Sequence, residues 1–168
     1  MPKITELLLA ELEREAAGTR RALERVPEGR DDWKPHEKSM PLGYLAALVA
    51  TMPGWIAAMI EQDELDVTAP GEQKTRSVKT NRELLEAFDN ALAKGKAALA
   101  GTTDEHLMTS WRMLAHGHVV SEQSRYQAIR DGALNHLAHH RGQLTVYLRL
   151  NDVPVPSLYG PTADEKGF

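Results

Sequence analysis

The sequence predicts an all-α fold, and three observations support this prediction. Apolar residues recur at helical spacing in four blocks of the chain, whereas only one short region alternates as a strand would. Helix-start signals precede two of these blocks, at Ser39 to Pro41 and at Thr80. The chain has 168 residues, which is the length of one domain. We therefore expect a single helical domain over residues 1–168.

The first two helices are expected near residues 2–26 and 41–62. The first block has one apolar face and should end where Pro27 and Gly29 follow. The second block is apolar on two sides, and it contains Pro53. Because proline removes a backbone donor and clashes with the preceding turn, this helix should be kinked.

The other two helices are expected near residues 80–100 and 122–150, and the last one should start at about Glu122 or Ser124. A polar stretch at 63–79 contains proline and glycine, so it predicts a long connection before the third helix. The third helix opens with Thr80 and Glu83 at the spacing of a capping box.

Two other regions are expected to lack helices. Residues Trp111 to Val120 are strand-like, so a short hairpin is the one exception that the all-α prediction admits. Residues 151–168 are rich in proline and are expected to form an extended C-terminal tail of the same domain.

Composition and charge exclude several classes of function. The chain has 24 acidic residues against 20 lysines and arginines, a net charge of −4, so nothing indicates a surface that coats nucleic acid. It has no cysteine, which excludes disulfides, zinc–thiolate sites and a cysteine nucleophile. The N-terminal residues lack the features of a signal peptide, and no apolar run approaches about 18 residues. We therefore expect a soluble, cytoplasmic protein that binds neither nucleic acid nor membranes.

The sharpest chemical feature is a pair of histidines in the last helical block. His136 and His140 are four residues apart, which places their imidazoles on one helix face with Cβ atoms about 5–6 Å apart. That face continues through apolar residues, so the pair should point into the helical core, whereas His139 lies one position off it. Two neutral imidazoles at this spacing are close enough to share a metal ion.

The spacing leaves two interpretations of the pair open. The histidines are either metal ligands or structural residues that each hydrogen-bond to a neighbour. A metal site also needs a third ligand and an open position for water or substrate. His118 can serve as this third ligand only if the chain between it and the last helix follows a nearly straight path to the pair. The full set of other histidines is His36, His106, His116 and His118.

Two segments of the chain resemble the DinB/YfiT-like family. One is LNHLAHHRGQLTVYLRL, residues 134–150, followed by DVPVPSLYGPTADE, and the other is WKPHEKSMPLGYLAALVATMPGW, residues 33–55. This resemblance implies a four-helix bundle in up-down-down-up order. The long connection predicted at 63–79 agrees with that order, because it lets the third helix return on a different side of the bundle.

The resemblance also implies a metal site. Such relatives hold a divalent metal with three histidines, one from the second helix and two from the last, and the latter correspond to His136 and His140. The position of the second-helix histidine is occupied here by Leu48. The resemblance therefore implies a divalent-metal site, with Zn or Ni as the ions that suit imidazole, weakened by the missing third histidine.

An activity and a partner follow from the same resemblance. Some relatives are thiol-dependent S-transferases or isomerases, in which the metal lowers the pKa of the thiol. A low-molecular-weight thiol, or another small molecule, is therefore the expected ligand, and a homodimer the expected assembly. The implied pocket is lined by Leu48, Trp55 and Tyr147. Arg141 or His36 is expected near its mouth.

Two functions of different classes thus stay open. The first is a metal-dependent protein with thiol-transferase activity. The alternative is a non-enzymatic bundle that binds a small molecule or acts as a scaffold without metal. The metal content of the purified protein separates them.

Overall fold

The architecture is mostly helical, with one small sheet. The computed structural model describes residues 2–69 and 80–166. Its elements are, in chain order, α1 (Ile4–Leu23), α2 (Leu42–Thr51), η1 (Met52–Gly54), α3 (Trp55–Glu61), β1 (Glu64–Asp66), α4 (Asn81–Gly101), α5 (Asp104–Leu107), β2 (Ser110–Ala115), β3 (His118–Ser124), α6 (Arg125–Ala128), η2 (Ile129–Asn135) and α7 (His136–Leu150).

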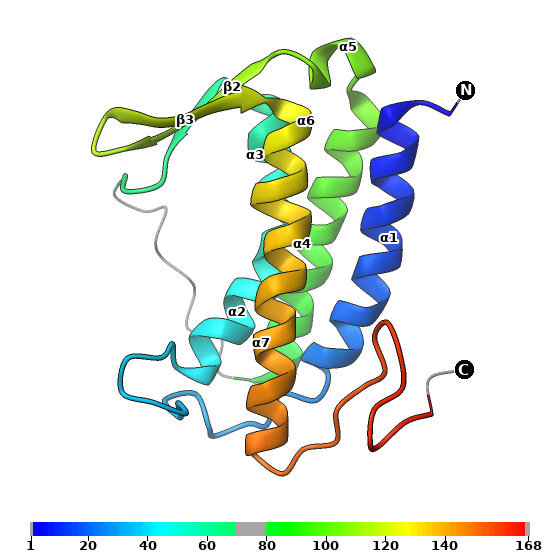
Figure 1. Ribbon diagram of the computed structural model, residues 1–168, viewed down its shortest axis with the longest axis vertical. Helices are drawn as coiled ribbons and strands as arrows, with labels where there is room; N and C mark the ends of the chain where they lie inside the picture. Colours follow the sequence, from blue (N-terminus) through cyan, green and yellow to red (C-terminus); the bar gives the residue numbers. More distant parts are fainter. Residues whose placement is uncertain (1, 70–79, 167–168) are drawn as a thin grey trace.

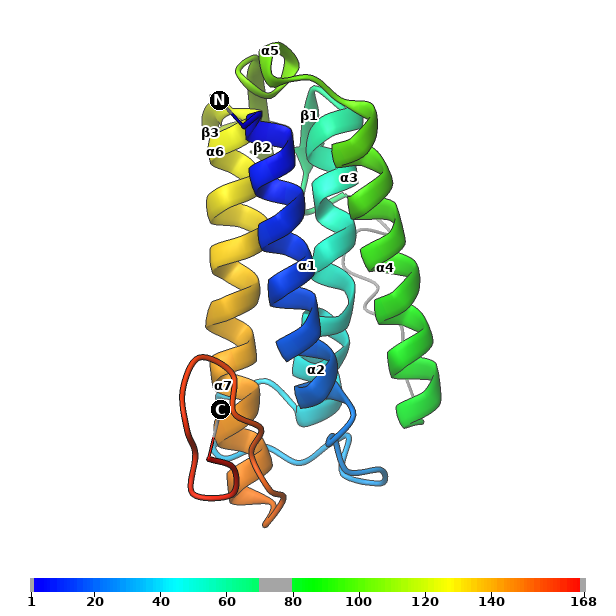
Figure 2. The ribbon, with the colours of Figure 1, turned by 90° about the vertical axis from the view of Figure 1, so that its right-hand side faces the viewer.

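The long helices lie side by side (Figures 1 and 2). Helix α1 and the continuous α6–η2–α7 segment run in one direction, and the α2–η1–α3 segment and α4 run in the opposite direction (Figure 1). Helices α1 and α2 each pack against both α4 and α7. The predicted connection at 63–79 falls mostly on residues 70–79, which lie outside the described residues.

Several helix boundaries agree with the sequence prediction, and one predicted cap differs from it. As predicted, the Thr80 hydroxyl accepts the backbone N–H of Glu83 at 3.2 Å at the start of α4. Ser39 is not a cap, because α2 begins after Pro41 without a side-chain cap. The last helical segment begins at Arg125 with Ser124 as its N-cap, which agrees with the second of the two predicted starts, Glu122 and Ser124. The Ser124 hydroxyl accepts the Gln127 N–H at 3.2 Å.

The second helical segment is interrupted at Pro53, as the sequence predicts. Residues Met52–Gly54 form a 3₁₀ turn between α2 and α3, since proline cannot donate the helical hydrogen bond. This turn lies very close to α4. A Cβ atom added to Gly95 would lie 2.4 Å from the Pro53 carbonyl oxygen, so only glycine fits at position 95.

The last helical segment contains a π-helix directly before the histidine pair. It spans Ile129–Asn135 and leads into α7 without a break. A Cβ atom added to Gly132 in this segment would lie 2.8 Å from Met59 Cε. Because η2 also contacts η1, the irregular turns of two neighbouring helical segments meet. Such π-helical turns frequently occur at functional sites.

The all-α prediction is wrong in one respect, because the described residues include a three-stranded sheet. This sheet projects at one end of the helices (Figure 1). Strands β2 and β3 form the hairpin expected around residues 111–120, and β1 adds a parallel partner to β2. The turn uses His116 and Gly117, at φ 52° and 76°, which suits a two-residue hairpin. Asp66 at the end of β1 accepts the Gly117 N–H at 2.7 Å. A strand of three residues such as β1 is too short to give a periodic signal.

The core consists of two apolar clusters along the helices. One lies toward the sheet and includes Leu8, Leu12, Ile56, Leu99, Leu107, Trp111 and Ile129. The other lies toward the opposite end and includes Leu42, Leu45, Val49, Phe88, Leu137 and Leu144. Trp55 packs against both clusters, so it lies where they meet.

The C-terminal segment, expected as an extended tail, folds back onto α1 and α7. The Val155 N–H donates to Asp164 at 2.8 Å and the Ser157 N–H donates to Glu165 at 2.8 Å, which closes the segment into a loop. Arg21 donates to the Ser157 carbonyl at 2.7 Å and also pairs with Glu165. Side-chain contacts of this kind are long-range, and a proline-rich composition does not reveal them.

The segment Leu42–Glu61 corresponds to the apolar helix expected near residues 41–62. Its length and composition would suffice to cross a membrane, but 61% of its most apolar window is buried inside the protein. It occupies the position of a core helix, whose apolar faces are covered by α4 and α7.

Candidate metal-binding site

The structure brings the two predicted histidines together on α7. His136 is the first residue of this helix and His140 lies one turn later. His140 is only 8% exposed, and His136 is half-buried. His139 between them is exposed, as its offset from the apolar face predicts. The pair therefore lies at the inner edge of α7, within reach of solvent at one side.

The two rings face each other through the same kind of nitrogen. His136 Nε2 and His140 Nε2 lie 2.9 Å apart, and the ring centroids are separated by 4.6 Å. The Nδ1 of His140 lies 2.7 Å from Gln143 Oε1. The Gln143 amide nitrogen lies 3.1 Å from His139 Nε2. Four residues of one helix thus form a continuous polar cluster.

Electrostatics favour the neutral form of His136. Burial lowers the pKa of its imidazole, and the positive charge of a protonated His140 lowers it further. The Gly132 carbonyl opposes this shift as a hydrogen-bond acceptor, and His139 adds a smaller decrease. Neutral imidazole is the form that binds metal ions.

Of the three residues expected to line the pocket, the structure places Trp55 in contact with the pair. The Trp55 and His136 rings meet edge-to-face, with centroids 5.8 Å apart. Leu48 is half-buried on α2 against the core cluster that also contains Leu137. Tyr147 is used elsewhere, because its hydroxyl donates to the Met40 carbonyl at 3.1 Å and its ring packs on Trp33.

The pair fits two positions in the coordination shell of a transition metal. Two Zn–N bonds of about 2.0–2.1 Å in tetrahedral geometry place the nitrogens about 3.3 Å apart, so a small rotation of either ring from the observed 2.9 Å suffices. Within residues 2–69 and 80–166, no group of three His, Asp or Glu side chains is arranged to hold a metal. The donor set suits an ion whose other positions are filled by water or an external ligand.

The remaining histidines lie away from the pair. His116 and His118 are exposed in the hairpin. His106 Nε2 lies 2.9 Å from the Ile60 carbonyl oxygen near the end of α3. The exposed His36 accepts the Lys38 N–H at 3.2 Å within its own loop. The straight path that would bring His118 to the pair, which the sequence left open, is therefore not observed.

Arg141 lies at α1 rather than at a pocket mouth. It is 1% exposed, and its guanidinium donates to the Glu15 carboxylate at 2.6 Å and the Thr19 hydroxyl at 3.0 Å. The Tyr159 hydroxyl, from the C-terminal loop, accepts from Arg141 and donates to Glu15 at 2.5 Å. The sequence analysis missed this buried ion pair. A signal was present, because Glu15 follows Leu12 by three residues on the buried stripe of α1.

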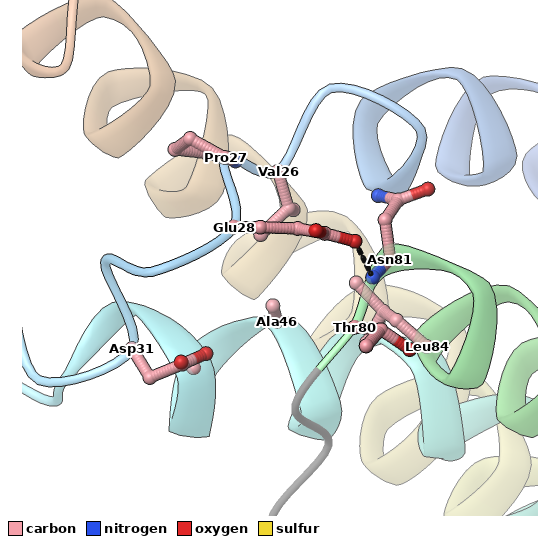
Figure 3. Close-up of a pocket in the computed structure, with 9 residues that line it drawn as sticks. Val26, Pro27, Glu28, Asp31, Ala46, Thr80, Asn81 and Leu84 are labelled. Atoms are coloured by element: carbon pink, nitrogen blue, oxygen red, sulfur yellow. Dashed lines mark hydrogen bonds between the residues drawn. The ribbon is translucent and has the colours of Figure 1, made fainter.

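Two cavities of the described residues lie apart from the histidines. The one in Figure 3 is bounded by the loop after α1 and the start of α4, where Glu28 accepts the Asn81 N–H at 2.9 Å. Its volume of about 20 Å³ holds one water. A larger groove of about 560 Å³ lies beside the start of α1 and includes Lys3, Leu99 and Asp104. Neither is lined by His136 or His140.

Comparison with known proteins identifies the family. A model of the DinB family matches residues 1–166. The chain belongs to the DinB family. The resemblance inferred from two sequence segments is therefore confirmed, and it extends over nearly the whole chain.

Solved structures of DinB-like proteins share the fold. A DinB-like protein from Bacillus cereus ATCC 10987 is 18% identical, with a TM-score of 0.70 over 90% of this chain and 95% of that chain. A DinB-like protein from Bacillus subtilis is 21% identical, with a TM-score of 0.68 over 89% of this chain and 96% of that chain. No curated protein matches the chain.

Proposed function

We propose that this DinB-family protein is an up-down-down-up four-helix bundle that binds a divalent transition-metal ion through His136 and His140. Zn and Ni are the ions that best suit two imidazole ligands. With Leu48 in place of a third histidine, the site is weaker than a three-histidine site and leaves more positions open to external ligands. We place the protein in the cytoplasm and expect it to work as a homodimer.

The observation that carries this proposal is the convergence of two Nε2 atoms at 2.9 Å in a half-buried place. Within the described residues, neither ring pairs with a carboxylate, and the ring neighbour outside α7 is Trp55. A lowered pKa keeps His136 neutral. The two imidazoles share one proton between their Nε2 atoms, and a cation that displaces this proton gains both lone pairs.

The reaction class that we propose is thiol transfer with a low-molecular-weight thiol. The chain has no cysteine, so a thiol nucleophile must come from a second substrate. A bound divalent ion lowers the pKa of a coordinated thiol and thus supplies thiolate at neutral pH. Trp55 provides an apolar wall beside His136, which suits an organic substituent.

One observation favours the alternative, a metal-free binding or scaffold protein. The described residues supply no third ligand, and His140 Nε2 already lies within hydrogen-bond distance of His136 Nε2. A proton on one of these nitrogens would make the pair a structural hydrogen bond.

Metal content separates the two proposals. The protein is purified without a histidine tag, dialysed, and analysed for Zn and Ni by mass spectrometry. We expect metal to be retained in stoichiometric amount and to be lost in His136→Ala and in His140→Ala. His106→Ala is the matched control, because its ring contacts the Ile60 carbonyl instead. Equal retention in all variants would refute the histidine-pair site, and no metal in the unmodified protein would favour the scaffold.

The tryptophan beside the pair offers a second measurement. Titration with Ni²⁺ should quench the fluorescence of Trp55, whose ring lies 5.8 Å from that of His136. We expect the quenched fraction to fall sharply in Trp55→Phe. Thiol-transfer activity is then tested only with protein that retains metal, so that metal binding and catalysis are judged separately.

A further inference from the structure

The contacts of Gln143 determine where His140 carries its proton. Gln143 Oε1 lies 2.7 Å from His140 Nδ1. An amide oxygen only accepts hydrogen bonds, so Nδ1 must be the protonated nitrogen in this arrangement. The Nε2 of a neutral His140 then carries a lone pair, and this atom faces His136.

His139 determines which way the Gln143 amide points. The Gln143 amide nitrogen lies 3.1 Å from His139 Nε2, and an NH₂ group only donates. His139 Nε2 is therefore the acceptor. If the amide turned over, its NH₂ would face His140 Nδ1 and would favour the opposite tautomer. The exposed His139 thus acts on the buried ring through Gln143.

The contact between the two rings then assigns the proton of His136. Two unprotonated nitrogens would repel each other at 2.9 Å, so one Nε2 of the pair must donate to the other. With the Nε2 of His140 unprotonated, the Nε2 of His136 is the donor in the metal-free protein. A metal ion that binds both Nε2 atoms must displace this proton.

We propose that Gln143 is a positioning residue that holds His140 in the Nδ1-protonated tautomer, and that His139 orients the Gln143 amide. The importance of this tautomer for metal binding rests on the proposed function. The tautomer itself is a property of the metal-free protein, so it can be tested alone.

An outer partner of this kind has a measurable effect on metal affinity. A hydrogen bond to the distant nitrogen of a ligating histidine fixes the ring and raises its basicity, and loss of such a partner typically costs about 10–100-fold in affinity. Gln143→Met keeps much of the side-chain volume but removes the acceptor. In Gln143→Glu, the side chain still ends in an acceptor and has no donor, so this variant should keep His140 in the Nδ1-protonated tautomer.

The tautomer is read in metal-free protein with ¹⁵N-labelled histidine, by long-range ¹H–¹⁵N correlation above pH 7.5. We expect His140 to be protonated on Nδ1 in the unmodified protein and in Gln143→Glu, and to shift toward Nε2 protonation in Gln143→Met. The matched control is Gln127→Met, on the same helical segment, where the exposed amide donates to Asp131 at 2.7 Å. Nε2 protonation of His140 in the unmodified protein, or an unchanged tautomer in Gln143→Met, would overturn the inference.

Zinc affinity, measured by competition with a chromophoric chelator, gives the second readout. We expect a decrease of about 10–100-fold in Gln143→Met, a smaller decrease in His139→Ala, and no change in Gln127→Met. Thermal unfolding identifies any variant that is merely misfolded, and recovery of affinity in Gln143→Glu excludes a purely structural role. Absence of zinc binding in the unmodified protein would contradict the proposed function. It would not affect the tautomer measurement, which uses metal-free protein.

Discussion

Arg141 and His140 are adjacent residues of α7, and each belongs to a polar cluster. The two clusters differ in how charge is compensated within them. Arg141 meets an opposite charge in Glu15 and further oxygens of Thr19 and Tyr159. Among the described residues, the ring nitrogens of His140 meet the His136 imidazole and the Gln143 amide. The first cluster satisfies its charge within the protein, whereas the second offers bases without an acid.

This difference separates a structural cluster from a candidate site. A buried charge is stable only when it is paired and hydrogen-bonded. The Arg141 cluster meets that requirement in all but the Nε atom, which has no hydrogen-bond partner in the part of the chain that the structure describes. His136 avoids this cost by remaining neutral, as its lowered pKa indicates. Arg141 thus stabilises the fold, and the histidines stay available for a ligand.

The largest expected effect is on stability, from Arg141→Met. Removal of the guanidinium leaves the Glu15 carboxylate buried without its close counter-charge, and loss of one partner of a buried pair typically costs about 3–5 kcal/mol. Urea unfolding measures the loss. Arg14→Met is the matched control, because Arg14 lies 4.0 Å from the same carboxylate but its side chain is 69% exposed, so its effect should stay within about 0.5 kcal/mol. Similar losses in both variants would contradict the assignment of Arg141 as the buried partner.

The second prediction adds a third histidine to the pair. Leu48→His introduces an imidazole where the family resemblance places one, and we expect divalent-metal affinity to increase by at least about tenfold, or about 1.4 kcal/mol. Addition of His136→Ala should abolish the gain, because the effect depends on a shared ion. Without metal, the buried imidazole should destabilise the protein by about 1–3 kcal/mol. Unchanged affinity in a folded Leu48→His protein would show that position 48 does not face the pair.

A smaller effect is expected where the C-terminal loop meets the charged cluster. Tyr159→Phe removes the hydroxyl that bridges Arg141 and Glu15 but leaves their ion pair intact. The free energy of unfolding should fall by about 0.5–1.5 kcal/mol. Tyr44→Phe, on the exposed surface of α2, should leave it unchanged. If Tyr159→Phe proves equally neutral, the hydroxyl contributes nothing to the cluster.

The smallest effect concerns the pH dependence of the loop itself. Backbone N–H donation from Ser157 and the arginines Arg25 and Arg21 lower the pKa of Glu165 from 4.5 to about 2. A carboxylate whose pKa is lowered in the folded state stabilises it above the unfolded pKa and loses that contribution as pH falls through the folded pKa. The stability difference between the unmodified protein and Glu165→Gln should therefore be full above pH 4.5 and vanish toward pH 2. A difference that is constant over this range would contradict the shift.

The sequence by itself determined the helices, the kink at Pro53, the Thr80 cap, the hairpin region and the histidine pair. Each of these depends on residues that are close in the chain. Periodicity, a proline inside a helix, a capping hydroxyl and an i,i+4 spacing act within one or two helical turns. The family resemblance, unlike these local patterns, concerns the chain as a whole. The match of the DinB-family model over residues 1–166 confirms this resemblance.

Only the tertiary structure decided which partners the local elements meet. Strand β1 pairs with β2 through residues 48 positions apart, such as Glu64 and Arg112, and the Arg141–Glu15 pair joins residues 126 apart. The same holds for the C-terminal loop, where Arg21 meets Glu165, and for Gly95, which approaches Pro53. A side chain's position on a helix face shows that it is buried, but the partner comes from an element packed later against that face. That is why Arg141 was expected at a pocket mouth and was found in a buried ion pair.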